Sequence, residues 1–481
     1  MMNLKPYPEY KDSGVEWLGK IPKHWTTKPL KHWVKMNRCT LPETTSPDTI
    51  IQYIDIGSVG IGLLKKQPEL MTFGNAPSRA RRILHKNDTI ISTVRTYLKA
   101  VYFVTNDQEN LIASTGFAVL TPRLNVNPRL LGYSIQDDFF IERVSANSVG
   151  ASYPAIVATK LNSMPLAMPI GIEEQRQIAR FINAKTHLLN RYIRNKRRLI
   201  ELLQEQKQAF INDCVTGKME VKKIVDENGN ASFRLEPYAE YKDSGVDWLG
   251  KVPKHWVITR IKRKIRNIAE QNSDSKSSDF CLALEHVESW TGKINPPEEA
   301  ITFESQVKRF QSNDILFGKL RPYLAKVARP DQSGVCVGEF LVLRSFDSKA
   351  LPEFLEYLLR CASFIYLVNS FTYGAKMPRA EWSSIGNILI PIPSTNEQTQ
   401  IIHFLKVKTR LIDNAISKAQ RQIELIREYR TRLIADVVTG KVDVRNIPVD
   451  DIPQDEAFAE SEEPENIDES IDIEDTEEDD S

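Results

Sequence analysis

Apolar residues recur at alternating four- and three-residue spacing in two long stretches of the chain, residues 173–220 and 396–444. That spacing predicts a helix with one apolar seam, interrupted by polar positions that can fix its register. The large apolar residues predicted in the two seams are Ile178, Ile182, Leu189, Tyr192, Leu199, Leu203, Phe210, Ile401, Leu405, Ile412, Ile426, Tyr429 and Leu433.

Each stretch is long enough for a helix of about 60 Å, given a rise of 1.5 Å per residue. An isolated helix of this kind would leave its seam in water, so we expect the two to pack together as an antiparallel coiled coil. In the alternative arrangement each helix caps its own domain and never meets the other. A shared Val-Thr-Gly-Lys sequence places Gly217 and Gly440 where each helix should end.

Short β-branched or aromatic runs, bounded by turn residues, precede each long helix and predict strands. The clearest are TIIQYIDIG, DTIISTV, LKAVYFV and GFAVL before the first helix and FCLALEHV, DILFGKL and VGEFLVLR before the second. A helix that opens at Pro352 follows the second group. This mixture of strands and helices predicts an α/β fold for both segments.

The chain is an internal repeat. Residues 6–25 match residues 237–256 at 17 of 20 positions, and residues 174–221 match residues 397–444 at 21 of 48. The intervening segments barely match, so two copies of a constant frame carry two different inserts, related by a pseudo-twofold. The predicted order is an α/β domain at 1–172, a helix at 173–220, a linker at 221–236, an α/β domain at 237–395, a helix at 396–444 and an acidic, disordered tail at 445–481.

Charge is distributed very unevenly. From Asp450 to the end the chain has 17 acidic residues and no Lys or Arg, so residues 1–449 hold all 64 basic residues, 46 acidic ones and a net charge of +18. A basic body favours a polyanionic partner, although a cationic surface can also be inert. Apolar runs of 18 residues and a signal peptide are absent, and five scattered cysteines favour free thiols in a reducing cytoplasm.

Sequence motifs of catalysis are incomplete. Asn295-Pro296-Pro297 is followed by Glu298, where an amino-methyltransferase needs an aromatic residue, and no glycine-rich cofactor loop precedes it. The two Thr-Gly-Lys sequences lack the upstream glycine of a phosphate loop. We therefore expect no catalytic residue and no metal site on this chain.

The two inserts share two short landmarks that suit binding. NDTIISTVRTYLKAV (87–101) aligns with NDILFGKLRPYLAKV (313–327), and GASYP (150–154) aligns with GAKMP (374–378). Arginine can read guanine or clamp phosphate, and tyrosine can donate to phosphate or stack on a base. The candidate DNA-binding residues are Arg95, Tyr97, Lys99, Ser152, Tyr153, Lys319, Arg321, Tyr323, Lys326, Lys376 and Arg379. In the structural alternative, Arg and Tyr at these strand ends anchor the fold.

The repeated frame EYKDSGVEWLGKIPKHW, the NDILFGKLRPYLAKV run, the EEQRQIARF helix start and the duplicated Val-Thr-Gly-Lys ending resemble the DNA-specificity subunit of type I restriction-modification enzymes. The resemblance covers nearly the whole chain outside the tail. It implies two target-recognition domains, each reading one half of a bipartite site in double-stranded DNA, and paired helices that dock two modification subunits.

The resemblance also implies where catalysis lies. S-adenosylmethionine would sit on the modification subunits, whereas ATP and Mg²⁺ would serve the restriction subunits. Candidate docking residues outside the seam are Arg180, Arg194, Arg197 and Arg198. Two other classes of protein remain open: a self-contained methyltransferase with a diverged site, and a coiled-coil adaptor that binds only proteins.

Overall fold

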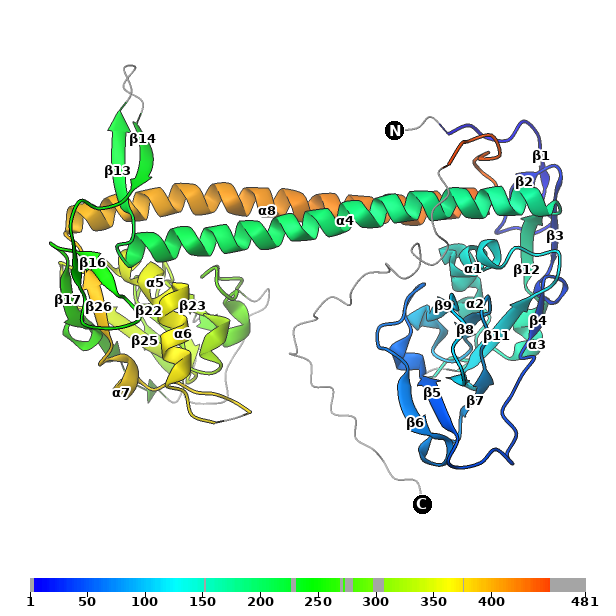
Figure 1. Ribbon diagram of the computed structural model, residues 1–481, viewed down its shortest axis with the longest axis horizontal. Helices are drawn as coiled ribbons and strands as arrows, with labels where there is room; N and C mark the ends of the chain where they lie inside the picture. Colours follow the sequence, from blue (N-terminus) through cyan, green and yellow to red (C-terminus); the bar gives the residue numbers. More distant parts are fainter. Residues whose placement is uncertain are drawn as a thin grey trace. The chain divides into compact units, whose positions relative to one another are not determined.

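The computed structural model describes residues 4–150, 153–225, 231–268, 271–272, 280–296, 307–374 and 376–449. The chain divides into two compact units, one made of residues 1–197 and 420–481 and the other of residues 198–419. Each unit contains one frame segment, one insert and part of each long helix (Figure 1). The predicted acidic tail lies outside the described residues from Asp450 onward.

Two four-stranded sheets form the insert of the first unit. Their orders are β6 (Glu69–Thr72), β5 (Ile50–Ile54), β10 (Leu111–Ser114), β7 (Ala80–Ile83), and β4 (Val34–Met36), β11 (Phe117–Pro122), β8 (Thr89–Ser92), β9 (Val101–Phe103). Neighbouring strands are antiparallel except β5 and β10, which are parallel. The remaining elements are the ladders β1 (Tyr10–Asp12) with β2 (Lys20–Pro22) and β3 (Trp25–Pro29) with β12 (Pro165–Pro169), and helices α1 (Pro128–Gln136), α2 (Asp138–Ala146) and α3 (Ala158–Ser163).

The second unit repeats this plan. Its sheets have the orders β18 (Ile265–Ile268), β25 (Phe340–Ser345), β22 (Ile315–Gly318), β23 (Val327–Ala328), and β19 (Gln271–Asn272), β21 (Val307–Phe310), β24 (Gly334–Val337), β20 (Cys281–Leu282). The other elements are α5 (Pro352–Arg360), α6 (Ala362–Ser370), α7 (Trp382–Ile385) and the ladders β15 (Tyr241–Asp243) with β16 (Lys251–Pro253) and β17 (Val257–Arg260) with β26 (Leu389–Ile392). Each of the seven predicted runs contains a strand, and the helix predicted at Pro352 is α5, so the α/β fold of both inserts is confirmed.

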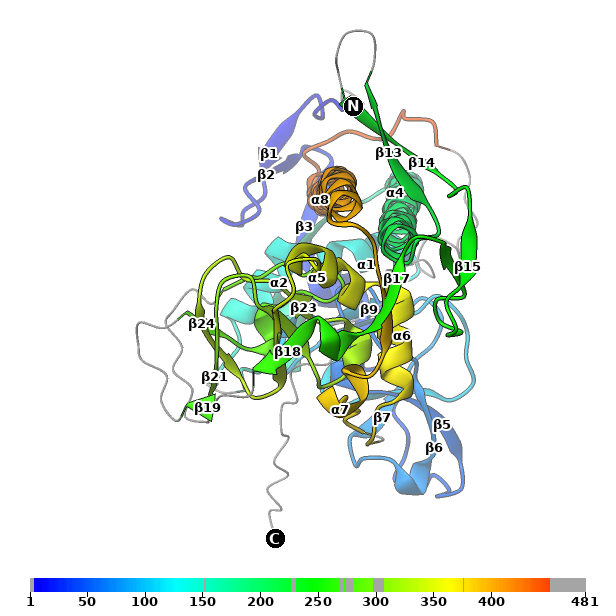
Figure 2. The same ribbon diagram turned by 90° about the vertical axis from the view of Figure 1, so that its left-hand side faces the viewer.

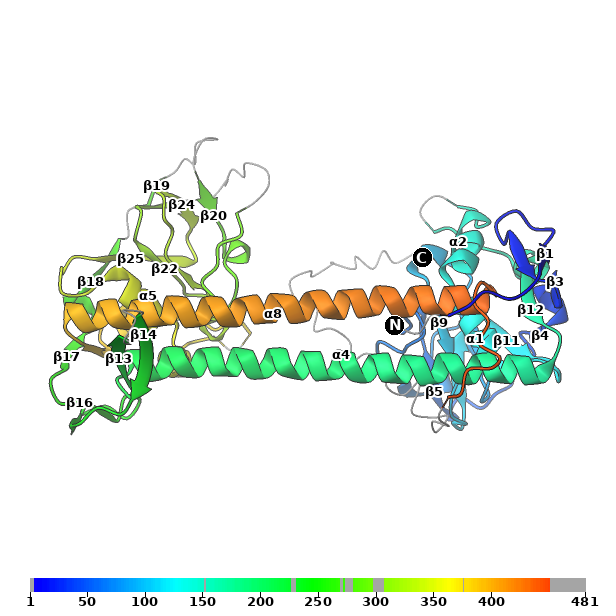
Figure 3. The ribbon, with the colours of Figure 1, turned by 90° about the horizontal axis from the view of Figure 1, so that it is seen from above.

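Two 44-residue helices, α4 (Ile172–Val215) and α8 (Thr395–Val438), pass through both units. In the first unit Arg430 of α8 donates to the Asn190 side chain of α4, at 2.7 Å. In the second unit Lys207 of α4 lies 2.7 Å from Asp413 of α8. Within each unit the early part of one helix therefore lies beside the late part of the other, so the helices run antiparallel (Figure 3).

The seam differs from its predicted register in part. Tyr192, Leu199 and Tyr429 are 51%, 41% and 40% exposed, so the prediction that they lie in the seam was wrong. Ile193, one residue later, is buried instead. Where two adjacent residues are both apolar, such as Tyr192 and Ile193, the sequence does not decide which one continues the seam. Here Ile193 does, and the exposed tyrosine can keep its hydroxyl in water. The other predicted seam residues are buried (Ile178, Ile182, Ile401, Leu405, Ile412 and Leu433) or half-buried (Leu189, Leu203, Phe210 and Ile426).

The end of each long helix packs on the frame segment of the other repeat. In the first unit Gly440, at φ +75°, is so close to Pro22 that an added Cβ would lie 2.4 Å from the proline ring. In the second unit Gly217, at φ +74°, meets Pro253 at the same distance. Glycine is therefore required at both helix ends by backbone conformation and by space, in agreement with the predicted C-terminal caps.

The segment predicted as a linker forms an antiparallel hairpin, β13 (Glu220–Val225) with β14 (Ala231–Glu236). It belongs to the second unit, where Phe233 packs against His403 and Phe404 of α8, with ring centroids 5.0 and 6.3 Å away. Figure 2 shows β13 and β14 beside α4 and α8. In the first unit the matching place is a single bridge between Lys5 and Asp443. In the second unit, therefore, the two paired segments are joined covalently through the hairpin. In the first unit the equivalent segments are the beginning and the end of the described chain.

Candidate nucleic-acid interface

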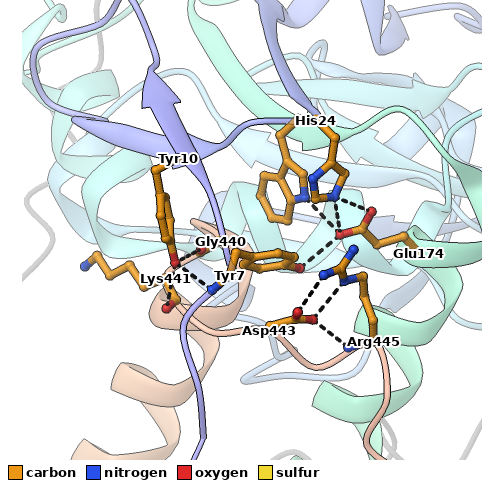
Figure 4. Close-up of polar contacts among 9 residues, drawn as sticks. Tyr7, Tyr10, His24, Glu174, Gly440, Lys441, Asp443 and Arg445 are labelled. Carbon is orange, nitrogen blue, oxygen red and sulfur yellow. Dashed lines mark hydrogen bonds and ion pairs between the residues drawn. The ribbon is translucent and has the colours of Figure 1, made fainter.

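One glutamate at the start of each long helix gathers the frame segment around it. In the first unit Glu174 accepts hydrogen bonds from Tyr7, Trp25 and His24 at 2.8–3.0 Å (Figure 4). Burial and the neighbouring carboxylate raise the pKa of Tyr7, so its hydroxyl stays protonated and donates. The frame is thereby fixed to the first turn of α4.

The second unit repeats this arrangement at Glu397. Its carboxylate accepts from Trp256 at 3.2 Å and contacts His255 at 2.8 Å. Burial raises the pKa of Glu397, but donors from His255, Ser394 and Trp256 more than offset it, and the net pKa is lowered. The repeated Tyr, His, Trp and Glu are therefore packing and hydrogen-bonding residues.

A fully buried glutamine beside each glutamate fixes the insert to the helix. Gln175 accepts from the backbone N–H of Asn127 at 2.7 Å and donates to the carbonyl of Pro169 at 2.9 Å. Gln398 does the same with Leu351 and Pro393, at 2.8 and 2.9 Å. All four partners are backbone groups, so the joint does not depend on the side chains of the insert.

The first shared landmark forms a strained turn in both units. Strand β8 leads into η4 (Thr96–Leu98), which is bounded by Arg95 at φ +49° and Lys99 at φ +53°. Strand β22 leads into η7 (Pro322–Leu324), bounded by Arg321 at φ +49° and Ala325 at φ +48°. Left-handed backbone at residues other than glycine costs about 1–3 kcal/mol each and is concentrated at functional sites.

The second landmark pairs with the first. In the first unit the N–H of Arg95 donates to the carbonyl of Pro154 at 2.8 Å, and Val94 forms a bridge with Ala155. In the second unit the N–H of Arg321 donates to Pro378 at 2.7 Å, and Leu320 pairs with Arg379. The structure therefore brings together two short sequences that lie more than fifty residues apart.

Aromatic side chains project from this paired turn, and of its two arginines Arg95 is exposed whereas Arg321 is half-buried. Tyr97 is 54% exposed, and its counterpart Tyr323 is 42% exposed. The guanidinium of Arg95 lies 4.6 Å above the ring of Tyr153, which is itself exposed. An exposed Arg–Tyr pair on a rigid turn can donate to phosphate and offer a face for stacking.

Three other candidates are engaged within the protein. Lys99 lies 2.6 Å from Asp138, Lys326 donates to the carbonyl of Leu284 at 2.9 Å, and Arg379 lies 3.0 Å from Glu339. These contacts give them a role in holding the turn. Lys376 is exposed, Lys319 is half-buried and pairs through its backbone with Ala380, and Ser152 lies outside the described residues.

Chemistry other than binding has little support in the described part of the chain. There, no three His, Cys, Asp or Glu residues are arranged to hold a metal ion. The described helices also include none that is both long and apolar enough to cross a bilayer.

Comparison with known proteins agrees with the repeat. A family described as "Type I restriction modification DNA specificity domain" matches residues 22–202 and 290–425. The chain is 21% identical to the type I restriction enzyme EcoDI specificity subunit of Escherichia coli, over 63% of this chain and 68% of that protein. It is 23% identical to the MjaIX specificity subunit of Methanocaldococcus jannaschii, over 93% and 99% of the two chains.

A solved chain supports the fold. It comes from a structure described as the "structural basis underlying complex assembly and conformational transition of the type I R-M system". The TM-score is 0.62 with 19% sequence identity, and the alignment covers 87% of this chain and 98% of that one.

Proposed function

Because the chain belongs to the family of type I restriction-modification DNA specificity subunits, we propose that each of its two units reads one half of a bipartite site in double-stranded DNA. The observation that carries this proposal is the strained Arg-x-Tyr turn with its exposed tyrosine, which is built alike in two inserts of different sequence. The shared turn positions phosphate, and divergent surfaces around it read different bases.

The basic body supports DNA as the partner. Residues 1–449 carry a net charge of +18, which favours a polyanion over a purely protein partner. The incomplete methyltransferase motif argues against a self-contained enzyme. We place methyl transfer with S-adenosylmethionine on two modification subunits, and ATP- and Mg²⁺-dependent cleavage on restriction subunits, in the cytoplasm.

The helices supply the docking surface in this proposal. Their buried seam residues leave other faces for partners, and Arg198 on one such face is exposed and paired with Glu201 at 2.8 Å. Two quasi-equivalent helical surfaces suit two copies of one partner.

The test is DNA affinity as a function of salt, measured for Arg95→Ala, Arg321→Ala and the exposed α8 control Arg421→Ala. If each arginine of the turn contacts a phosphate, affinity should fall about tenfold, and the slope of log affinity against log salt should flatten by about 0.9 per lost contact. The control should bind normally. Unchanged affinity in both turn variants would contradict a DNA-binding role for the turn.

A further inference from the structure

A cavity of about 270 Å³ lies in the first unit, where α1 and α4 begin close together. Three arginines, Arg129, Arg176 and Arg180, line it together with Asn127, Asn183 and a single acid, Glu173. The arginines come from elements some fifty residues apart in the chain, so no sequence pattern indicated the cavity. Its lining carries a net charge of +2 and a set of amide groups that can also bind an anion.

The setting strengthens this positive charge. Arg129 is only 8% exposed, and its guanidinium lies 5.4 Å from the ring of Phe103. Arg176 forms an ion pair with Glu173, which offsets one of the three positive charges and leaves the net charge of +2. Charges partly removed from water interact more strongly with an anion than fully solvated ones do. Arginine is also the side chain whose planar fork matches a carboxylate.

The second unit has a different chemistry at the equivalent place. Glu353 stands for Arg129, Thr399 for Arg176 and His403 for Arg180. There Glu353 pairs with Lys406 at 2.6 Å, and the ring of Phe233 from the hairpin lies 5.0 Å from that of His403. The arginine cavity is therefore particular to the first unit and is not a requirement of the repeated frame.

The last described residues contact the same turn of α4 that lines this cavity. Gln177, next to Arg176 on α4, donates to the carbonyls of Val444 and Ile447, at 3.3 and 2.8 Å. Val449 packs against the core of the same unit. The sequence from Asp450 onward then carries 17 carboxylates and no basic residue.

We propose that the acidic segment 450–481 binds in cis to the arginine cavity of the first unit. Carboxylates match guanidinium groups in charge and geometry. The segment can reach about 100 Å when extended, far more than it needs, and tethering gives it an effective concentration of the order of millimolar. It would then compete with any other polyanion for these arginines.

The test measures how fast phenylglyoxal modifies individual arginines, followed by peptide mass spectrometry. It compares the full chain with a full-length variant in which every Asp and Glu of residues 450–481 is changed to Asn or Gln. Arg198 and Arg421 are matched controls, because each pairs with a glutamate three residues away, as Arg176 does, but lies outside the cavity.

The proposal predicts that Arg176 and Arg180 react several-fold more slowly in the natural chain than in the neutral variant, and that 1 M salt removes the difference. Arg198 and Arg421 should react alike in both chains. Equal rates at Arg176 and Arg180, or the same slowing at the two controls, would overturn the proposal. Neither outcome bears on DNA recognition.

Discussion

The two units have similar contacts where the insert joins the frame, but they differ in the residues next to the Arg-x-Tyr turn that they share. Glu174 and Gln175 of the first unit recur as Glu397 and Gln398 in the second, where each glutamate contacts the repeated His and Trp and each glutamine contacts equivalent backbone groups. By contrast, the exposed Tyr153, which stacks on Arg95, is replaced by Met377. The difference teaches that the glutamine joints can stay constant because they bind backbone groups of the insert, while the surface that would meet DNA is free to vary.

The two units also differ in the partners of one buried carboxylate in the core. Asp88 and Asp314 are equivalent carboxylates, 1% and 1% exposed, at the start of β8 and β22. Asp314 accepts two hydrogen bonds from Arg344, both at 2.7 Å. Asp88 accepts from the Thr121 hydroxyl at 2.6 Å and from the backbone N–H of His85 at 2.9 Å, and burial raises its pKa. One unit therefore pairs its buried carboxylate with a guanidinium, and the other pairs it with a hydroxyl, with the His85 imidazole 3.7 Å away.

The largest expected effect comes from removing these two charges. Asp314→Asn should lower the free energy of unfolding by about 3 kcal/mol, because it breaks a largely buried bidentate ion pair. Asp88→Asn should cost less, about 1 kcal/mol, because an amide oxygen can still accept from Thr121 and only the hydrogen bond from the His85 N–H is lost. Thermal unfolding and hydrogen exchange at β22 and β8 would measure this. Equal losses in both variants would show that the two cores are not different in kind.

A middle-sized effect is expected in the helix pair. Lys207–Asp413 and Arg430–Asn190 occupy equivalent places, but only the first is an ion pair. Lys207 is 6% exposed, so Asp413→Ala should destabilise the second unit by about 1.5 kcal/mol. Asn190→Asp would recreate the ion pair beside Arg430 and should stabilise the first unit. Denaturant unfolding of both variants is the measurement, and a loss of stability in Asn190→Asp would count against equivalence of the two pairs.

The smallest effect depends on pH. Asp137 caps α2, where the second unit has Cys361, and burial raises the pKa of Asp137 to about 6. The folded chain then holds this proton more tightly than the unfolded one, so stability is lost as pH rises from about 4 to 6. Asp137→Asn should stabilise the chain at pH 7.5 and leave its stability unchanged at pH 4. Unfolding curves at both pH values check this, and a gain that does not change with pH would point to another cause.

Local features predicted the elements well. Apolar runs next to Asn-Asp turns marked β8 and β22, Pro352 marked the start of α5, and the repeated glycines marked both helix ends. In each case the signal and its structural cause lie within a few residues of each other, so tertiary contacts did not have to be known.

The sequence did not predict contacts between residues that lie far apart in the chain. The Arg-x-Tyr turn meets the Gly150–Pro154 segment through backbone hydrogen bonds, which carry no side-chain signature. Adjacent apolar residues concealed the seam register at Tyr192 and Ile193. The packing of each helix end on the other repeat's frame depends on chain topology, although the repeated Gly and Pro were visible from the start.

The central claim is that each unit reads its own half of the DNA site through its own insert. The direct measurement is to replace residues 26–172 with the corresponding insert of another family member, and to select bound sequences from random duplex DNA. The account predicts a new sequence in one half of the site, with the other half and the spacing between them unchanged. A change in both halves, or in neither, would contradict it.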